Sequence, residues 1–178
     1  MALSLFDVSI PVLVRGLSNL SAIIDKAAAH AEAKKLDPTA LAQARLFPDM
    51  FPLARQVQVT CDTAKGAAAR LAGIEIPKHE DNETTLPELK QRLAKTLDEL
   101  HARVRSTLAY LNGFTAADFA SAATRVVTQP RWEGKTMTGA DYFLEHVLPN
   151  FFFHTTHVFA ILRHNGVEVG KGDYLGEI

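Results

Sequence analysis

The sequence predicts an all-α four-helix bundle with a small β-hairpin before the last long helix. Two observations carry this prediction. Apolar residues recur every three to four positions over four long stretches, and capping residues or glycines stand at the ends of those stretches. We expect residues 1–178 to form a single helical-bundle domain, because 47% hydrophobic content in 178 residues is enough for one core.

The first two predicted helices are separated by a long connection. The first runs over residues 5–33, and residues 36–48 form a segment long enough to be a crossover. Asp49 is the expected N-cap of the second helix, with Pro52 in the first turn, where the missing amide costs little. Gly73 is the expected stop of this helix.

The third helix has the clearest start and stop signals. Thr85 and Glu88 form a capping box before a run of leucines at helical spacing, and the helix is expected to stop at Asn112 and Gly113. Residues 115–119 then suggest a further short turn.

The hairpin and the last helix follow in the final third of the chain. Residues 125–128 and 135–137 are β-type runs that flank a loop containing proline and glycine. A capping box that begins at Thr138 predicts the start of the fourth helix, and Gly166 predicts its end. Residues 167–178 look irregular.

The charge balance excludes some classes of partner. The chain has 19 Lys plus Arg against 20 Asp plus Glu, and the basic residues are scattered, so we expect no nucleic-acid partner. No stretch approaches the roughly 18 uncharged apolar residues of a membrane-spanning helix, so no membrane association is expected either. One cysteine allows no intramolecular disulfide, which suits a soluble cytoplasmic protein.

Four of the seven histidines lie in the stretch HVLPNFFFHTTHVFAILRHNG, residues 146–166. At about 100° per residue, His146, Asn150, His154 and His157 share one face of the predicted fourth helix. That face is a polar seam on a helix that is otherwise apolar nearly all round. Such a helix is expected to be central in the bundle.

A metal site is one interpretation of this seam. His154 and His157 are three positions apart, about 5 to 6 Å between their Cβ atoms, and two imidazoles can close that separation onto one divalent cation. Zinc, nickel, iron and copper all suit imidazole ligands. The third ligand must come from another helix, and Asp7, Asp49 and Asp62 are candidates between which the sequence does not select.

A polar seam without metal is the competing interpretation, because buried histidines often only form hydrogen bonds. Pro149 is expected to kink the helix beside Asn150 and so to create a polar pocket there. A third interpretation places His146 in a pH-sensitive dimer contact. Cys61 is expected to be a buried, inert thiol, and Trp132 an anchor of the hairpin on the bundle.

Three blocks carry a resemblance to a known family: SLFDVSIPVLVRGLSNLSAIIDKAAAHAEAKKLDP, ARLFPDMFPLARQVQVTCDTAKGAAARLAG and LPNFFFHTTHVFAILRHNGVEVGKGDYLG. Together they resemble an uncharacterised bacterial family with a DinB/YfiT-like fold. The resemblance implies a four-helix bundle of metalloenzyme type, commonly a homodimer, whose relatives include thiol-dependent transferases and isomerases.

The resemblance also implies where a metal would bind. Metal-binding members of the wider superfamily use one histidine from the second helix and a His-x-x-x-His pair from the last. Counted back from ILRHNG, the second histidine of the pair is His154, but Asn150 stands in place of the first. Residues 51–58 contain no histidine. One of three ligands remains, so the metal site is expected to be degenerate.

We therefore expect an uncharacterised soluble bacterial DinB-like protein that binds a small molecule in a polar pocket on its last helix. The expected pocket residues are Asn150, His154, His157 and Gln56. The alternative is a metal-dependent enzyme of the thiol-dependent transferase or isomerase type, in which His154 and His157 hold zinc or nickel. Whether the chain is an enzyme stays open at this point. A homodimer is the expected assembly.

Overall fold

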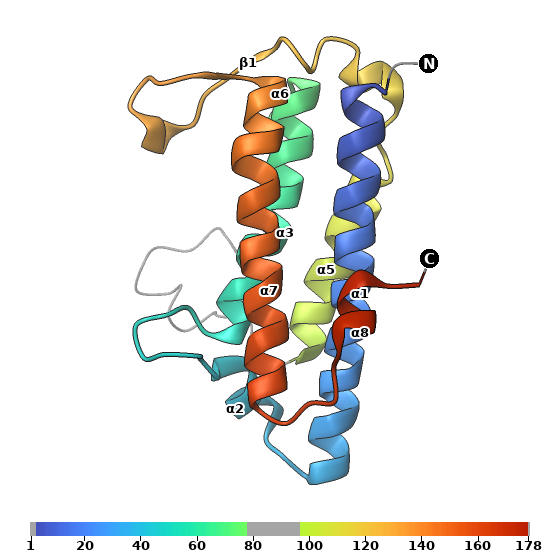
Figure 1. The fold of residues 1–178 in the computed structure, drawn as a ribbon, viewed down its shortest axis with the longest axis vertical. Coiled ribbons are helices and arrows are strands. Elements are labelled where there is room, and N and C mark those ends of the chain that lie inside the picture. Colours follow the sequence, from blue (N-terminus) through green and yellow to red (C-terminus); the bar gives the residue numbers. More distant parts are fainter. Residues whose placement is uncertain (1–2, 78–96, 178) are drawn as a thin grey trace.

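Four long helices lie alongside one another in the computed structural model (Figure 1). They are α1 (Leu5–Lys34), α3 (Leu53–Ala72), α5 (Leu97–Leu111) and α7 (Leu148–His164). The structure describes residues 3–77 and 97–177. Contacts run from α1 to α5, from α5 to α3, from α3 to α7 and from α7 back to α1. The predicted four-helix bundle is confirmed.

Helix α1 begins at the capping box that its first residues encode. The backbone amide of Asp7 donates to Ser4 Oγ over 3.2 Å, and Asp7 Oδ2 accepts from the amide of Ser4 over 2.9 Å. Pro11 lies inside the helix, and the last turn closes on Lys35 in the left-handed conformation. The helix predicted for residues 5–33 is confirmed.

Among the residues that the structure describes, α1 is long and apolar enough to cross a membrane, judged by length and composition alone. The side chains of Leu13, Leu17 and Leu20 are fully buried against the rest of the bundle. The core helix of a soluble protein meets the same criterion of length and composition, and this burial is typical of a core helix. These leucines of α1 therefore belong to the hydrophobic core of the bundle.

The connection after α1 contains a short helix, α2 (Pro38–Gln43), within the predicted crossover. Helix α3 then begins one residue after Pro52, which is its N-cap, so the prediction that Asp49 caps this helix was wrong. Asp49 is exposed in a turn in which the amide of Met50 donates to the carbonyl of Phe47 over 3.0 Å. This turn delays the start of the helix.

Two glycines allow close approaches in the bundle. Gly73 ends α3 with φ of 75°, and an added Cβ would meet the guanidinium of Arg125. The predicted stop is confirmed. At Gly16 of α1, an added Cβ would lie 2.6 Å from the ring of Phe151, so this glycine lets the fully buried ring of α7 pack against α1.

The described part of α5 ends at Leu111, directly before Asn112 and Gly113 as predicted. The predicted capping box of Thr85 and Glu88 lies outside the described residues. The predicted turn after α5 is a 3-10 helix, η2 (Ala116–Phe119), which confirms that expectation.

The predicted hairpin is present with short strands. Strand β1 (Val126–Val127) pairs antiparallel with β2 (Met137–Thr138), and Val127 lies opposite Met137. A 3-10 turn, η3 (Pro130–Trp132), stands between the strands. In Figure 1 the hairpin extends from one end of the bundle, beside the start of the last helical segment.

The last long helix starts in three steps. Thr138 Oγ1 accepts from the amide of Asp141 over 3.2 Å and caps α6 (Gly139–Asp141), as predicted. A π-helical segment, η4 (Tyr142–Val147), follows and leads into α7. Pro149 lies in the first turn of α7 and has no amide to donate, so the helical spacing changes just before it.

The chain after α7 was predicted to be irregular, and for its last part this was wrong. Residues Lys171–Leu175 form a short helix, α8, that packs on α1. Arg15 of α1 donates to the carbonyl of Leu175 over 3.2 Å, and Lys26 pairs with Asp173 over 2.6 Å. These long-range contacts hold a segment whose own sequence gives little helical signal.

Candidate functional site

The four predicted pocket residues lie where α3 and α7 face one another. Gln56 belongs to α3, while Asn150, His154 and His157 belong to α7. The structure joins Gln56 to His154 directly. Asn150 forms its hydrogen bond with Thr63 of α3. His157 forms its hydrogen bond within α7.

The contact between His154 and Gln56 is short and buried. His154 Nδ1 lies 2.7 Å from Gln56 Oε1, and the histidine is 8% exposed. Gln56 Nε2 donates to the carbonyl of Phe51 over 3.4 Å, which orients the amide so that its oxygen faces the ring. Because that oxygen only accepts, the hydrogen-bond network assigns the proton of the neutral ring to Nδ1. The lone pair of this ring is then on Nε2.

The charge state of His154 follows from its surroundings. Burial lowers the pKa of His154 to about 4, with smaller contributions from the charges of His157 and Arg55. At pH 7 the ring is therefore neutral. Within residues 3–77 and 97–177, no hydrogen bond involves its Nε2, so the site presents a mostly buried neutral acceptor.

His157 is fixed in a different way. Its Nδ1 lies 2.7 Å from the carbonyl oxygen of Phe153, one turn earlier in α7, and its ring packs on the Phe153 ring with centroids 4.2 Å apart. A carbonyl oxygen accepts, so Nδ1 donates and Nε2 has the lone pair when the ring is neutral. Both predicted imidazoles thus have Nδ1 occupied by an acceptor.

Asn150 contributes to the packing of α7 on α3. Its Nδ2 donates to Thr63 Oγ1 over 2.8 Å, and the side chain is half-buried. The amide therefore bonds across to the neighbouring helix. The structure shows two adjacent polar contacts between α3 and α7, one at Asn150 and one at His154.

No group of three or more His, Cys, Asp and Glu side chains in the described part of the chain is placed to hold a metal ion. The three carboxylates that the sequence offered as a third metal ligand are each in a different environment. Asp7 caps α1, where hydrogen bonds from Ser4 lower its pKa, and Asp49 is exposed in its turn. Asp62 forms an ion pair with Arg103 at 2.6 Å.

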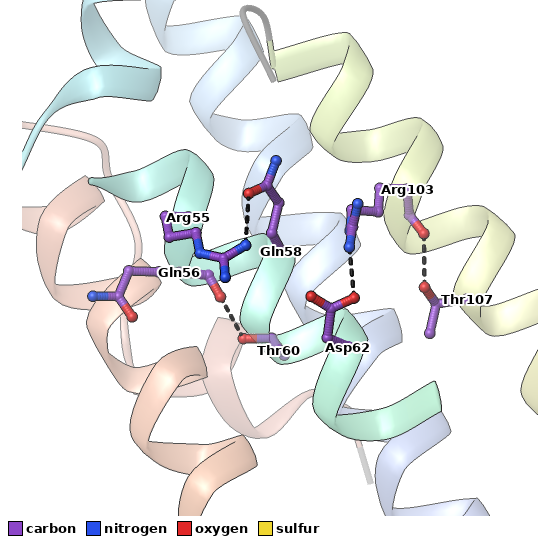
Figure 2. Close-up of polar contacts among 7 residues, drawn as sticks. All are labelled: Arg55, Gln56, Gln58, Thr60, Asp62, Arg103 and Thr107. Atoms are coloured by element: carbon purple, nitrogen blue, oxygen red, sulfur yellow. Dashed lines mark hydrogen bonds and ion pairs between the residues drawn. The ribbon is translucent and has the colours of Figure 1, made fainter. Parts of the chain in front are cut away.

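A row of polar side chains on α3 was not recognised as a group from the sequence, and Figure 2 shows Arg55, Gln58 and Asp62 of this row. Arg55, Gln58, Asp62 and Lys65 recur at spacings of three and four, which places them on one face of the helix. Arg55 Nη1 donates to Gln58 Oε1 over 3.3 Å, and Asp62 pairs with the buried Arg103 of α5. The spacing of these residues could have predicted the row. Polar residues that recur at helical spacing on an otherwise apolar helix indicate polar contacts with a neighbouring helix.

His146 lies in a separate cluster at the hairpin end of the bundle. Its Nε2 accepts from Arg131 Nη2 over 2.9 Å, and its ring stacks on Tyr142 with centroids 5.7 Å apart. The half-buried ring of Trp132 packs edge-on against His146 at 5.2 Å, as expected for an anchor. Burial, followed by the charges of Arg131 and Arg70, lowers the pKa of His146.

A cavity of about 400 Å³ lies at another place, between the end of α1 and the start of α5. Ala31 and Glu32 of α1 and Leu97 and Asp98 of α5 are among its lining residues. None of the four predicted pocket residues lines this cavity. The pocket at His154 stays a prediction.

Comparisons with known proteins agree with the resemblance seen in the sequence. The model of a family described as a domain of unknown function, DUF1993, matches residues 5–101 and 94–175. A crystal structure of a DinB family member from Shewanella denitrificans is 51% identical over 98% of this chain and 93% of that one, with a TM-score of 0.82. No curated protein matches. The chain therefore belongs to the DUF1993 family, an uncharacterised family with a DinB-like fold.

Proposed function

We propose that this protein binds a small molecule that donates a hydrogen bond to Nε2 of His154. The observation that carries the proposal is the 2.7 Å contact between His154 Nδ1 and Gln56 Oε1. This contact fixes the ring in the tautomer that leaves Nε2 as an acceptor. A hydroxyl, a thiol or an amide N–H is the matching chemical group on the ligand.

The low pKa of His154 supports the same proposal. A ring with a pKa of about 4 is neutral near pH 7, so its acceptor is present there. A protonated ring would have no acceptor to offer. Burial also strengthens a hydrogen bond to this nitrogen, because little water competes for it.

A screen of small alcohols, thiols and primary amides by NMR tests this proposal. The protein carries ¹³C-labelled histidine, and the shifts of the ring protons report binding at each histidine. We expect some probes to shift the His154 signals of the wild type and of a His164→Leu control, which changes an exposed histidine on the same helix. If His154→Leu, verified as folded by circular dichroism, still binds the same probes, the assignment is wrong.

A second candidate function, a metal-dependent enzyme of the thiol-dependent transferase or isomerase type, has its own supporting observation. The two imidazoles of His154 and His157 are close enough for the charge of one to lower the pKa of the other, and each has Nδ1 occupied by an acceptor. Histidines that ligate a metal through Nε2 commonly donate from Nδ1 in this way. A third ligand is still needed for zinc or nickel.

Metal content separates the two candidates. Elemental mass spectrometry on protein purified without a histidine tag would show stoichiometric metal in the wild type, and its loss in both His154→Ala and His157→Ala, if the enzyme proposal holds. Protein without metal after dialysis against zinc and nickel would leave the binding proposal.

The proposed assembly is a homodimer, which rests on the family resemblance, and the proposed compartment is the cytoplasm, which rests on the single cysteine. Sedimentation velocity of the full chain tests the assembly directly. A dimer that dissociates between about pH 7 and pH 5 would implicate His146 in the contact, because histidine titrates there.

A further inference from the structure

Two exposed phenylalanines contact the pair formed by Gln56 and His154. Phe153 is 54% exposed, and its ring packs edge-on against His154 with centroids 5.1 Å apart. Phe51 is 48% exposed, and its carbonyl accepts the hydrogen bond from Gln56 Nε2. Single exposed apolar residues are ordinary, but here one exposed ring packs on His154 and a second exposed phenylalanine bonds Gln56 through its backbone, so both apolar side chains are available to a ligand.

A guanidinium group lies beside the same pair. Arg55 precedes Gln56 on α3, and its Cζ is 5.8 Å from the centroid of the Phe51 ring. The side chain is half-buried and donates to the neutral amide of Gln58 (Figure 2). Burial is the main cause of the low pKa of His154, and the charges of His157 and then of Arg55 lower it further, so Arg55 lies within electrostatic range of the ring.

Arg55 has no carboxylate within ion-pair distance among residues 3–77 and 97–177. Asp62 is the carboxylate on the same row of α3, and it forms its ion pair with Arg103 at 2.6 Å instead of with Arg55. A half-buried guanidinium without a carboxylate favours an anion that brings its own negative charge, and its planar fork matches a carboxylate in particular.

We infer that the His154 site takes a small carboxylate that also carries an apolar or aromatic group and a hydroxyl or thiol. Arg55 binds the carboxylate, Phe51 and Phe153 pack on the apolar group, and His154 Nε2 accepts from the hydroxyl or thiol. The inference rests on the proposed function and adds the charge and shape of the ligand. The site thus selects anions over neutral molecules of the same size.

Mandelate is a suitable probe, because it combines a carboxylate, a hydroxyl and a phenyl ring. Mandelamide is its neutral counterpart. We would titrate each into the full chain and follow the ring signals of His154 by NMR. We expect mandelate to bind the wild type at least tenfold more tightly than mandelamide does.

Variants locate the charge that is responsible. Arg55→Gln is expected to weaken mandelate binding at least tenfold and to leave mandelamide unchanged. Arg55→Lys keeps the charge and is expected to retain part of the affinity, which provides a second variant if the first is unstable. Arg131→Gln is the matched control, since it removes an exposed arginine from the distant hairpin cluster.

The outcomes distinguish the inference from the proposed function. If mandelamide shifts the His154 signals with the same affinity as mandelate, the preference for anions is wrong and the hydrogen-bonding site stands. Equal losses in Arg55→Gln and Arg131→Gln would also overturn the inference, because they would indicate general electrostatic attraction. If neither compound perturbs His154, both the inference and the proposed function fail.

Discussion

His146 of η4 and His154 of α7 lie eight positions apart in the sequence, yet their side chains are held in opposite ways. The partner of His146 is a donor, Arg131, which occupies the lone pair of Nε2. The partner of His154 is an acceptor, Gln56, which occupies the N–H of Nδ1. The type of partner decides which histidine keeps an acceptor for a ligand.

Burial alone does not make this distinction. Both rings have a lowered pKa, and burial is the largest cause for each. The neutral state is therefore shared, and only the hydrogen-bond partner differs. A comparison of the two histidines by mutation tests this account, and four expected effects follow in order of size.

The largest expected effect is on stability at low pH. His154 has a pKa of about 4 when folded and about 6.5 when unfolded, so between these values the unfolded state binds more protons. The free energy of unfolding must then fall as the pH falls from 6.5 to 4, by up to about 3 kcal/mol from this residue. Urea denaturation at several pH values measures the slope.

The two histidines should differ in this pH experiment. His154→Phe is expected to lose much of the slope between pH 6.5 and 4, whereas His146→Phe should retain most of it, since the shift at His154 is the larger one. Equal slopes in the wild type and in His154→Phe would contradict the assigned pKa.

The second effect comes from the partner of His154. Gln56→Leu removes the acceptor and leaves the Nδ1 proton of a buried ring without its hydrogen bond, which is expected to lower the free energy of unfolding by about 2 kcal/mol. Gln43→Leu is the control, because Gln43 is exposed on α2. A loss in Gln56→Leu no greater than in the control would show that the contact does not stabilise the fold.

The third effect concerns the neighbouring contact between α3 and α7. Asn150→Ala removes the hydrogen bond to Thr63, and because this pair is half-buried we expect a loss of about 1 kcal/mol at neutral pH. A double-mutant cycle with Thr63→Ala isolates the pairwise contribution. Additive losses would mean that the two side chains do not interact in solution.

The smallest effect is expected at the hairpin. Arg131→Gln removes a positive charge beside His146, so the pKa of His146 should rise toward its ordinary value while that of His154 stays unchanged. NMR titration of the ring protons follows both residues in one experiment. An unchanged His146 pKa would mean that this arginine does not contact the ring in solution.

Local sequence signals predicted the elements that depend on local backbone geometry. Gly73 and the cap at Thr138 mark helix boundaries because they satisfy the helix ends with residues close in sequence. Asp49 failed as a cap because it lies in a turn, after which Pro52 is the N-cap and α3 begins at Leu53. Helix α8 was missed because Arg15 and Lys26, more than a hundred positions away, hold it on α1.

The site could be predicted in part. Helical spacing placed Asn150, His154 and His157 on one face, and Gln56 was named as a pocket residue. The pairing of Gln56 with His154 spans 98 positions, and the sequence has no local signal for it. Arg55 was missed because an arginine on a helix is ordinary, and only the folded chain shows its lack of a carboxylate among the described residues.

The tautomer of His154 is the most direct test of the central claim. Long-range ¹H–¹⁵N spectra of ¹⁵N-histidine protein at pH 7, with His154→Phe for assignment, report which ring nitrogen carries the proton. The account predicts a neutral ring with the proton on Nδ1 and a bare Nε2. A proton on Nε2, or a charged ring at this pH, would contradict it.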